Sequence, residues 1–323
     1  MLIKTAEEIR DIAIATIANE ASAISTLKNA INEDFVRSVE HIVSSNGRLV
    51  ITGIGKSANI AQKIVSTFNS TGTPSIFMHA ADAVHGDLGI IREDDIIICL
   101  SKSGETPEIK VLVPLLKSRN NLLIAIVGNT SSYLAQRADL VLDTTVEKEA
   151  CPNNLAPTAS TTAQLVMGDA LAVALLSCRG FTEEDFARFH PGGSLGKRMY
   201  LKVSDLYVQN EKPMVTPDAD IKSAIMEIST KRLGAAAVVE GEELIGIITD
   251  GDLRRMLEQD GDIAALKASD IMTAAPRTIN EDELVVNALE VMRQNKITQL
   301  PVLKEGKYVG VIHMHDIIKE GII

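Results

Sequence analysis

A strand that runs directly into a serine-rich turn and then a helix constrains the fold more than any other feature of this chain. Residues 95–100 are mostly β-branched and apolar, and Pro107 stands where the first turn of a helix tolerates proline. Ser101, Ser103 and Thr106 therefore gather, with a glycine, at the carboxyl end of a buried parallel strand. Their hydroxyls, free backbone N–H groups and the positive end of the helix dipole favour a phosphate monoester. A helix cap without a ligand is the alternative.

The same alternation of strands and helices extends over the first part of the chain. A helical pattern covers residues 5–46, a long helix over 160–178 ends at Gly180, and Thr182 with Asp185 caps a further short helix. The elements predicted between them are strands at 48–52, 75–78, 95–100, 122–127 and 140–142, with helices at 56–70 and 107–118. We expect an α/β domain over residues 1–198, with a five-stranded parallel sheet flanked by helices and ligand groups at the carboxyl ends of its strands.

Charge and composition exclude some partners. The chain has 43 Asp and Glu against 32 Lys and Arg, a formal net charge of -11, so neither nucleic acid nor an anionic membrane is expected as a partner. The three cysteines follow no metal-ligand or disulfide spacing. We find no signal-peptide pattern and no apolar run of about 18 residues. We therefore expect a soluble cytoplasmic protein with reduced thiols.

The rest of the chain is an internal duplication. Residues 203–206 match 268–271, and residues 246–253 match 310–317. Each copy predicts a strand, a helix, two short strands and a helix. This pattern resembles a tandem α+β pair of cystathionine-β-synthase (CBS) modules, here over 203–262 and 268–323.

The CBS resemblance implies a nucleotide site in the cleft between the copies, where Thr249 and Asp252 would meet phosphate and ribose. The second copy keeps Asp316 but has His313 in the place of the threonine. A repeat pair that only joins subunits is the alternative to a ligand sensor. The effector that suits a sensor is a nucleotide or a nucleotide-linked sugar such as CMP-Kdo.

Residues 53–58, Gly-Ile-Gly-Lys-Ser-Ala, look like two nucleotide motifs and satisfy neither. A P-loop needs a glycine where Val50 stands, and the dinucleotide motif needs an acid near residues 75–78. What remains is a glycine turn that presents Lys56 and Ser57 from a helix start. We expect Lys56 to face an anion, with a solvated surface lysine as the alternative.

Further segments support one family. Residues 53–57, 70–74, 85–89, 101–106, 148–152, 156–162 and 190–193 resemble the sugar isomerase (SIS) domain of arabinose 5-phosphate isomerases. An SIS domain followed by two CBS modules is also that family's domain order. The resemblance implies a homotetrameric aldose-ketose isomerase that interconverts D-ribulose 5-phosphate and D-arabinose 5-phosphate, for Kdo and lipopolysaccharide biosynthesis.

The resemblance also assigns residues. Lys56, Glu108, Glu149 and His190 fall on the four catalytically relevant positions of the family. The positions near the sugar phosphate are Gly72, Thr73, His79 and His85, together with Ser57, Ser101, Ser103 and Thr106. His79 would also hold an inhibitory zinc, although the chain departs from the family pattern just after it, at residues 80–82.

The chemistry of an aldose-ketose isomerase needs a base at C1 and C2, a proton donor for ring opening and a group that stabilises an oxyanion. Glu149 is our candidate for the base, and we expect the apolar residues 150–152 to raise its pKa. Glu108 would orient Lys56 or a hydroxyl. His85 would open the ring, and His190 would reach a neighbouring subunit. The residues require no metal or cofactor.

Each of these roles has an alternative without catalysis. Glu149 lies in a charged run and could be a surface residue, and a single histidine is often structural. Two other functions also remain open at this point. One is a sugar-phosphate or nucleotide sensor without catalysis, and the other is an isomerase of a different phosphosugar.

Overall fold

The computed structural model describes residues 4–258 and 263–322, which form two compact units, Met1–Phe189 and His190–Ile323. The division falls before residue 198, where the sequence places the end of the first domain. The predicted boundaries at residues 1, 262 and 323 lie outside the described residues.

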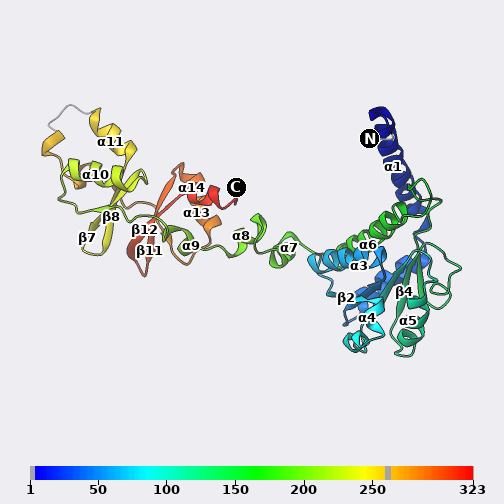
Figure 1. The fold of residues 1–323 in the computed structure, drawn as a ribbon. Coiled ribbons are helices and arrows are strands. Elements are labelled where there is room, and N and C mark those ends of the chain that lie inside the picture. The colour runs from blue at the N-terminus through cyan, green and yellow to red at the C-terminus, as the bar shows by residue number, and fades with distance from the viewer. Residues whose placement is uncertain (1–3, 259–262, 323) are drawn as a thin grey trace. The chain divides into compact units, whose positions relative to one another are not determined.

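The first unit alternates helices and strands (Figure 1). In chain order its elements are α1 (Ala6–Leu27), the 3₁₀ helix η1 (Lys28–Ala30), α2 (Glu33–Ser44), β1 (Leu49–Gly53), α3 (Lys56–Ser70), β2 (Ser75–His79), α4 (Ala80–Ala83), η2 (Asp87–Ile90), β3 (Ile96–Ser101), α5 (Pro107–Lys117), β4 (Leu123–Val127), β5 (Leu140–Asp143), α6 (Ala159–Cys178) and α7 (Glu183–Phe189). The helical pattern predicted over 5–46 is divided among α1, η1 and α2. Asn32 accepts a hydrogen bond from the Phe35 N–H and begins a new helix, α2.

The five predicted strands form one parallel sheet, in the order β2-β1-β3-β4-β5. The strand order reverses at β1, because the chain goes from β1 outward to β2 and then returns to the other side for β3. In sheets of this kind the crevice at the reversal is where ligands bind.

Both faces of the sheet are apolar because successive strand residues face opposite sides. On one face Ile51, Ile98 and Ile124 pack in a core with α1, α2, α3 and α6. On the other face Val50 and Ile97 pack with α4 and α5 (Figure 1). The near-continuous apolar strands of the sequence follow from this double burial.

Helix α6 is long and apolar enough to cross a membrane by length and composition alone. Core helices meet the same test, and Met167 and Leu171 are buried in the core against the sheet. Gly168 lets α6 approach α3, since a Cβ there would lie 2.4 Å from Ile64 Cδ1. The helix therefore has a structural use inside the first unit.

The second unit contains the duplication. Its elements are α8 (Ser194–Tyr200), α9 (Val203–Tyr207), β6 (Met214–Val215), α10 (Ile221–Lys231), β7 (Ala235–Glu240), β8 (Glu243–Thr249), α11 (Asp250–Leu257), η3 (Ile263–Ala265), α12 (Ala268–Ile271), β9 (Thr273–Ala274), β10 (Ile279–Asn280), α13 (Val285–Asn295), β11 (Gln299–Lys304), β12 (Lys307–His313) and α14 (Met314–Lys319). The predicted order of strand, helix, two strands and helix is confirmed in both copies. The sheets are β6-β7-β8-β9 and β10-β11-β12.

The two copies exchange their opening helices. Val203 and Leu206 of α9 are buried in the core of the second copy, and Ala268 of α12 is buried in the core of the first. The backbone contacts correspond as well, since the Val203 N–H donates to Glu283 O and the Ala268 N–H donates to Ala219 O, both at 2.8 Å. The two modules are therefore interlocked.

We predict that Gly310→Val destabilises this interlocked pair. A Cβ at Gly310 of β12 would lie 2.7 Å from the ring of Tyr207 in α9, and a hydrogen bond of 2.7 Å from Tyr207 to Glu281 holds that ring in place. Overpacking of this kind costs about 1 to 3 kcal/mol. Denaturant unfolding of the full chain measures it, with Gly89→Val as the control because nothing lies within 4 Å of a Cβ there. Equal stability of the two variants would contradict the exchange.

Candidate active site

The carboxyl ends of β1 and β3, where the strand order reverses, border a cavity of about 340 Å³. The register places Gly53 beside Leu100, so the two turns that follow these strands face each other. The residues that line the cavity are Ile54, Lys56, Ser57, Ser101, Lys102, Ser103, Thr106, Pro157 and Thr161. The structure therefore brings together five of the predicted site residues, from two segments far apart in the sequence.

In the serine-rich turn after β3, two of the three hydroxyl oxygens accept hydrogen bonds from backbone N–H groups of the turn itself. Ser101 Oγ accepts from the Gly104 N–H at 3.0 Å, and Ser103 Oγ accepts from the Glu105 N–H at 3.2 Å. Thr106 precedes α5 and its Oγ1 is buried, with no hydrogen-bond partner among the described residues. Buried polar atoms are nearly always paired, so this hydroxyl at a helix N-terminus lacks the partner that an anion would supply.

Glu149 is buried beside this cavity, at 3% exposure. Its Oε1 accepts from Lys102 Nζ at 2.6 Å and Ser160 Oγ at 2.5 Å. Its Oε2 accepts from the N–H groups of Thr158 at 2.8 Å and Ser160 at 3.1 Å, and from Thr158 Oγ1 at 3.1 Å. The start of α6 thus holds the Glu149 carboxylate next to Lys102 of the serine-rich turn.

These donors correct one prediction. Burial by itself raises the pKa of Glu149, but the hydrogen bonds from Lys102, Ser160 and Thr158 outweigh it and lower the pKa to about 2. The expectation that the apolar residues 150–152 raise this pKa is wrong, because the partners of the carboxylate come from other segments. In this arrangement Glu149 is ionised and a weak base.

Lys102 is the residue that sequence reasoning missed. It lies inside the serine-rich motif, yet only the neighbouring hydroxyls received a role. Thr158 and Ser160 were likewise part of a recognised motif without an assigned function. The available signal was a lysine between two predicted phosphate ligands.

His79 and His85 lie near the same edge of the sheet. His79 ends β2 in register with Gly53, and its Nδ1 is 3.6 Å from Asp82 Oδ2. His85 is exposed, in the turn after α4. Among the described residues, no group of three or more His, Cys, Asp or Glu side chains is placed to hold a metal ion, so the zinc expected at His79 stays a prediction.

The residues that line this cavity do not include Gly72, Thr73 or Glu108. Gly72 and Thr73 precede β2, at the amino edge of the sheet, where both contact Arg179. A strand of five residues spans about 16 Å, so within one chain they do not meet a sugar at the Ser101 turn. Glu108 is half-buried in the first turn of α5, and His190 begins the second unit. The roles of these four residues stay predictions.

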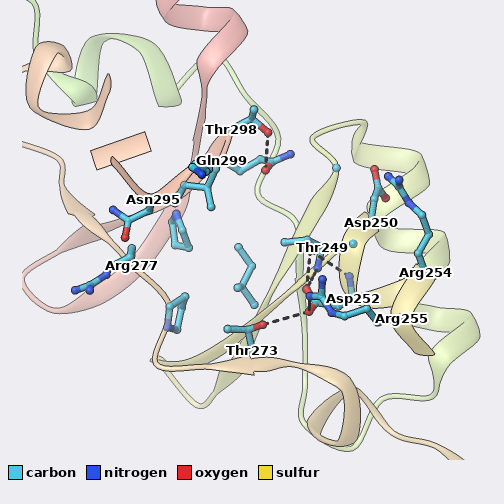
Figure 2. A pocket seen from close by; sticks show the side chains of 17 residues that line it. Thr249, Asp250, Asp252, Arg254, Arg255, Thr273, Arg277, Asn295, Thr298 and Gln299 are labelled. Carbon is cyan, nitrogen blue, oxygen red and sulfur yellow. Dashed lines mark hydrogen bonds and ion pairs between the residues drawn. The ribbon is translucent and has the colours of Figure 1, made fainter. Parts of the chain in front are cut away.

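A second cavity, of about 640 Å³, lies between the two CBS copies (Figure 2). Thr249, Asp252 and Thr273 come from its first-copy side, whereas Asn295 and Gln299 come from the second copy. Asp252 accepts hydrogen bonds from Thr249 at 2.6 Å and from Thr273 at 3.2 Å, and it forms an ion pair with Arg255. Burial raises the pKa of Asp252, but these donors lower it overall and keep the carboxylate ionised.

Asp316 is the equivalent carboxylate of the second copy, and it has different partners. Asp316 accepts from Asn210 Nδ2 at 2.6 Å and from the His313 N–H at 2.9 Å. His313 stacks on His315, with ring centroids 4.9 Å apart. Both hydrogen bonds to Asp316 are to its Oδ2, and the residues that line the large cavity include Asp252 and not Asp316.

The comparisons agree with this geometry. A serine-rich turn at the reversal of a parallel sheet, followed by an interlocked repeat pair, defines a protein of the SIS class with a CBS pair. Residues 41–174 match the SIS domain family, and residues 203–259 and 268–322 match the CBS domain family.

The chain belongs to the arabinose 5-phosphate isomerase family. It is 45% identical over 312 residues to arabinose 5-phosphate isomerase KdsD of Francisella tularensis, with 95% of both chains covered. It is 43% identical over 309 residues to KdsD of Escherichia coli K12, covering 95% of this chain and 94% of the relative. A solved structure from E. coli CFT073, in complex with arabinose 5-phosphate, is 39% identical with a TM-score of 0.56, and the match covers 58% of this chain and all of that one.

The ionised state of Glu149 predicts a pH-dependent stability. Its folded pKa of about 2 lies below the ordinary value of 4.5, so the carboxylate stabilises the fold above about pH 4.5, and this contribution is lost as pH falls toward 2. Glu149→Gln is therefore expected to lower the free energy of unfolding by roughly 3 kcal/mol at pH 7, and by less at pH 3. Urea unfolding between pH 3 and 7 measures the difference. Glu147→Gln, at an exposed carboxylate of the same run, is the control. A Glu149→Gln deficit that stays constant with pH would contradict this account.

Proposed function

We propose that this protein is an arabinose 5-phosphate isomerase, which interconverts D-ribulose 5-phosphate and D-arabinose 5-phosphate through an enediol and supplies the precursor of Kdo in lipopolysaccharide. The observation that carries the proposal is the cavity between the β1 and β3 turns. The buried Thr106 hydroxyl lines it and has no hydrogen-bond partner among the described residues, and Lys102, which also lines it, contacts the ionised carboxylate of Glu149. Membership of the isomerase family supports the reaction.

In this proposal each part of the cavity has a task. Ser101, Ser103 and Thr106 bind the phosphate, with Ser57 beside them. Lys56, exposed at the start of α3, stabilises the enediolate oxygen. Glu149 exchanges the proton between C1 and C2, and Glu108 is the alternative candidate for this base. His85 and His190 serve ring opening. The proton transfers need only carboxylate and imidazole groups, so we propose that no metal or cofactor takes part.

We further propose that the working enzyme is a cytoplasmic homotetramer. Gly72 and Thr73 lie at the far edge of the sheet from the cavity in their own chain. If they contact the sugar, a second copy must supply them.

The reaction is tested by incubating the purified full chain with ribulose 5-phosphate in deuterated solvent and ethylenediaminetetraacetate. We expect arabinose 5-phosphate to form and to carry deuterium at C2. A panel of other pentose and hexose phosphates should react much more slowly. Activity lost in chelator and restored by a divalent ion would contradict the metal-free reaction. Absence of turnover in every condition would contradict the isomerase.

For the repeat pair we propose a regulatory nucleotide or CMP-linked sugar in the cavity at Thr249 and Asp252. Asp252 is a buried carboxylate beside a large cavity, a group suited to accept ribose hydroxyls. Arg254, Arg255 and Arg277 line the same cavity and suit a phosphate. Asp316 is not among the residues that line this cavity and is the weaker site.

A matched pair of variants tests this asymmetry. Asp252 and Asp316 each complete a capping box at the start of a helix, α11 and α14, so their substitution by alanine removes the same local contact. Calorimetry with AMP and CMP-Kdo on the full chain is expected to show about tenfold to hundredfold weaker binding for Asp252→Ala. Binding by Asp316→Ala is expected to stay close to wild type. The reverse order of effects would place the site in the second copy.

A further inference from the structure

The carboxylate of Glu149 has no acceptor position to spare. Five donor contacts converge on it, from Lys102, from the hydroxyls of Thr158 and Ser160, and from the N–H groups of the same two residues. Each oxygen of an ionised carboxylate offers about two lone-pair positions, and on Oε1 both are taken, one by Lys102 and one by the Ser160 hydroxyl. Glu149 therefore cannot take a proton from a substrate carbon while all five donors stay in place. One donor must leave before this carboxylate acts as a base.

Lys102 is the donor that can leave. Thr158 and Ser160 belong to the start of α6, and Ser160 is 2% exposed. Their backbone N–H groups cannot turn away without unwinding the helix. The Lys102 side chain is 42% exposed and has four rotatable bonds, whereas its backbone is held by a 3.0 Å hydrogen bond from the Gly128 N–H to Lys102 O. The ammonium group can move while the turn that carries it stays fixed.

The cavity offers this ammonium group a stronger partner. Lys102 lines it between Ser101 and Ser103, near the unpaired hydroxyl of Thr106. A bound phosphate monoester carries about -1.5 to -2 charges near neutral pH, against -1 on Glu149. In a partly desolvated pocket the larger charge attracts the ammonium group more strongly.

We propose, building on the isomerase function above, that Lys102 moves from Glu149 to the phosphate of the incoming sugar phosphate and thereby frees one lone pair of Glu149 Oε1 to act as the base. Lys102 is then a positioning residue that links phosphate recognition to activation of the carboxylate. Loss of its hydrogen bond also removes a main cause of the low pKa of Glu149, so the carboxylate becomes a stronger base. A sugar without a phosphate leaves Lys102 on Glu149 and the base blocked.

Lys102→Met tests the proposal through the separation of KM from kcat. If Lys102 binds the phosphate, the variant binds inorganic phosphate about tenfold to hundredfold more weakly in calorimetry, and KM rises by a similar factor. Because one lone pair of Glu149 Oε1 is then free at all times, kcat at saturating substrate stays within about threefold of wild type. Lys102→Arg keeps the charge and is expected to recover most of the phosphate affinity.

Lys117→Met is the matched control. Lys117 also makes a 2.6 Å ion pair, with Asp139, whose other oxygen accepts a backbone N–H from Leu123. Lys117 lies in the last turn of α5, whereas the serine-rich turn precedes the first turn of that helix. We therefore expect Lys117→Met to leave phosphate affinity, KM and kcat unchanged.

The outcomes separate this inference from the proposed function. A Lys102→Met variant with lower kcat but wild-type phosphate affinity would mean that Lys102 only holds Glu149 in place, and would overturn the inference. Lys102→Gln is tested in parallel, and circular dichroism shows whether each variant is folded. If the wild type binds phosphate through Lys102 but converts no sugar phosphate, the anion role of Lys102 is supported and the isomerase proposal fails.

Discussion

Burial of the parallel sheet on both faces is the constraint on which the rest of the first unit depends. Every residue of β1, β3 and β4 is buried, and helices cover both sides. Polar side chains that contact a ligand cannot lie along such strands, because every position there is buried in a core. They are confined to the turns at the strand ends, and the reversal of strand order at β1 separates two of these turns enough to leave a cavity.

The same burial makes the charge of Glu149 expensive unless it is compensated. A carboxylate removed from water needs donors on each lone pair, and the start of α6 provides them through Thr158 and Ser160. Lys102 completes the set with a positive charge. The fold thus holds Glu149 as an ionised carboxylate that is a weak base. In the mechanism that we propose, a phosphate in the adjoining cavity changes this state by drawing Lys102 away.

Much of this architecture was readable in the sequence because it depends on local patterns. The five strands appear as apolar β-branched runs, and the Ser101 turn followed by Pro107 marks a strand-to-helix junction. The break near Asn32 was missed because the apolar pattern continues across it. Side-chain contacts between segments that are far apart in the sequence could not be predicted either. The pKa of Glu149 depends on Lys102 and Ser160, whereas sequence reasoning looked at its neighbours, residues 150–152.

The repeat pair shows how identical local chemistry acquires different surroundings. Thr249 with Asp252, and His313 with Asp316, form the same capping box in the two copies. The exchange of opening helices brings a different chain segment to each box, and Asn210, which follows α9, reaches Asp316. In the first copy Thr273, which follows α12, reaches Asp252 instead, and the adjoining cavity stays large. The asymmetry of the two sites therefore comes from the segments that the interlocked fold places beside them. Duplication supplied two matching carboxylates, and packing leaves one of them facing a cavity that a ligand can fill.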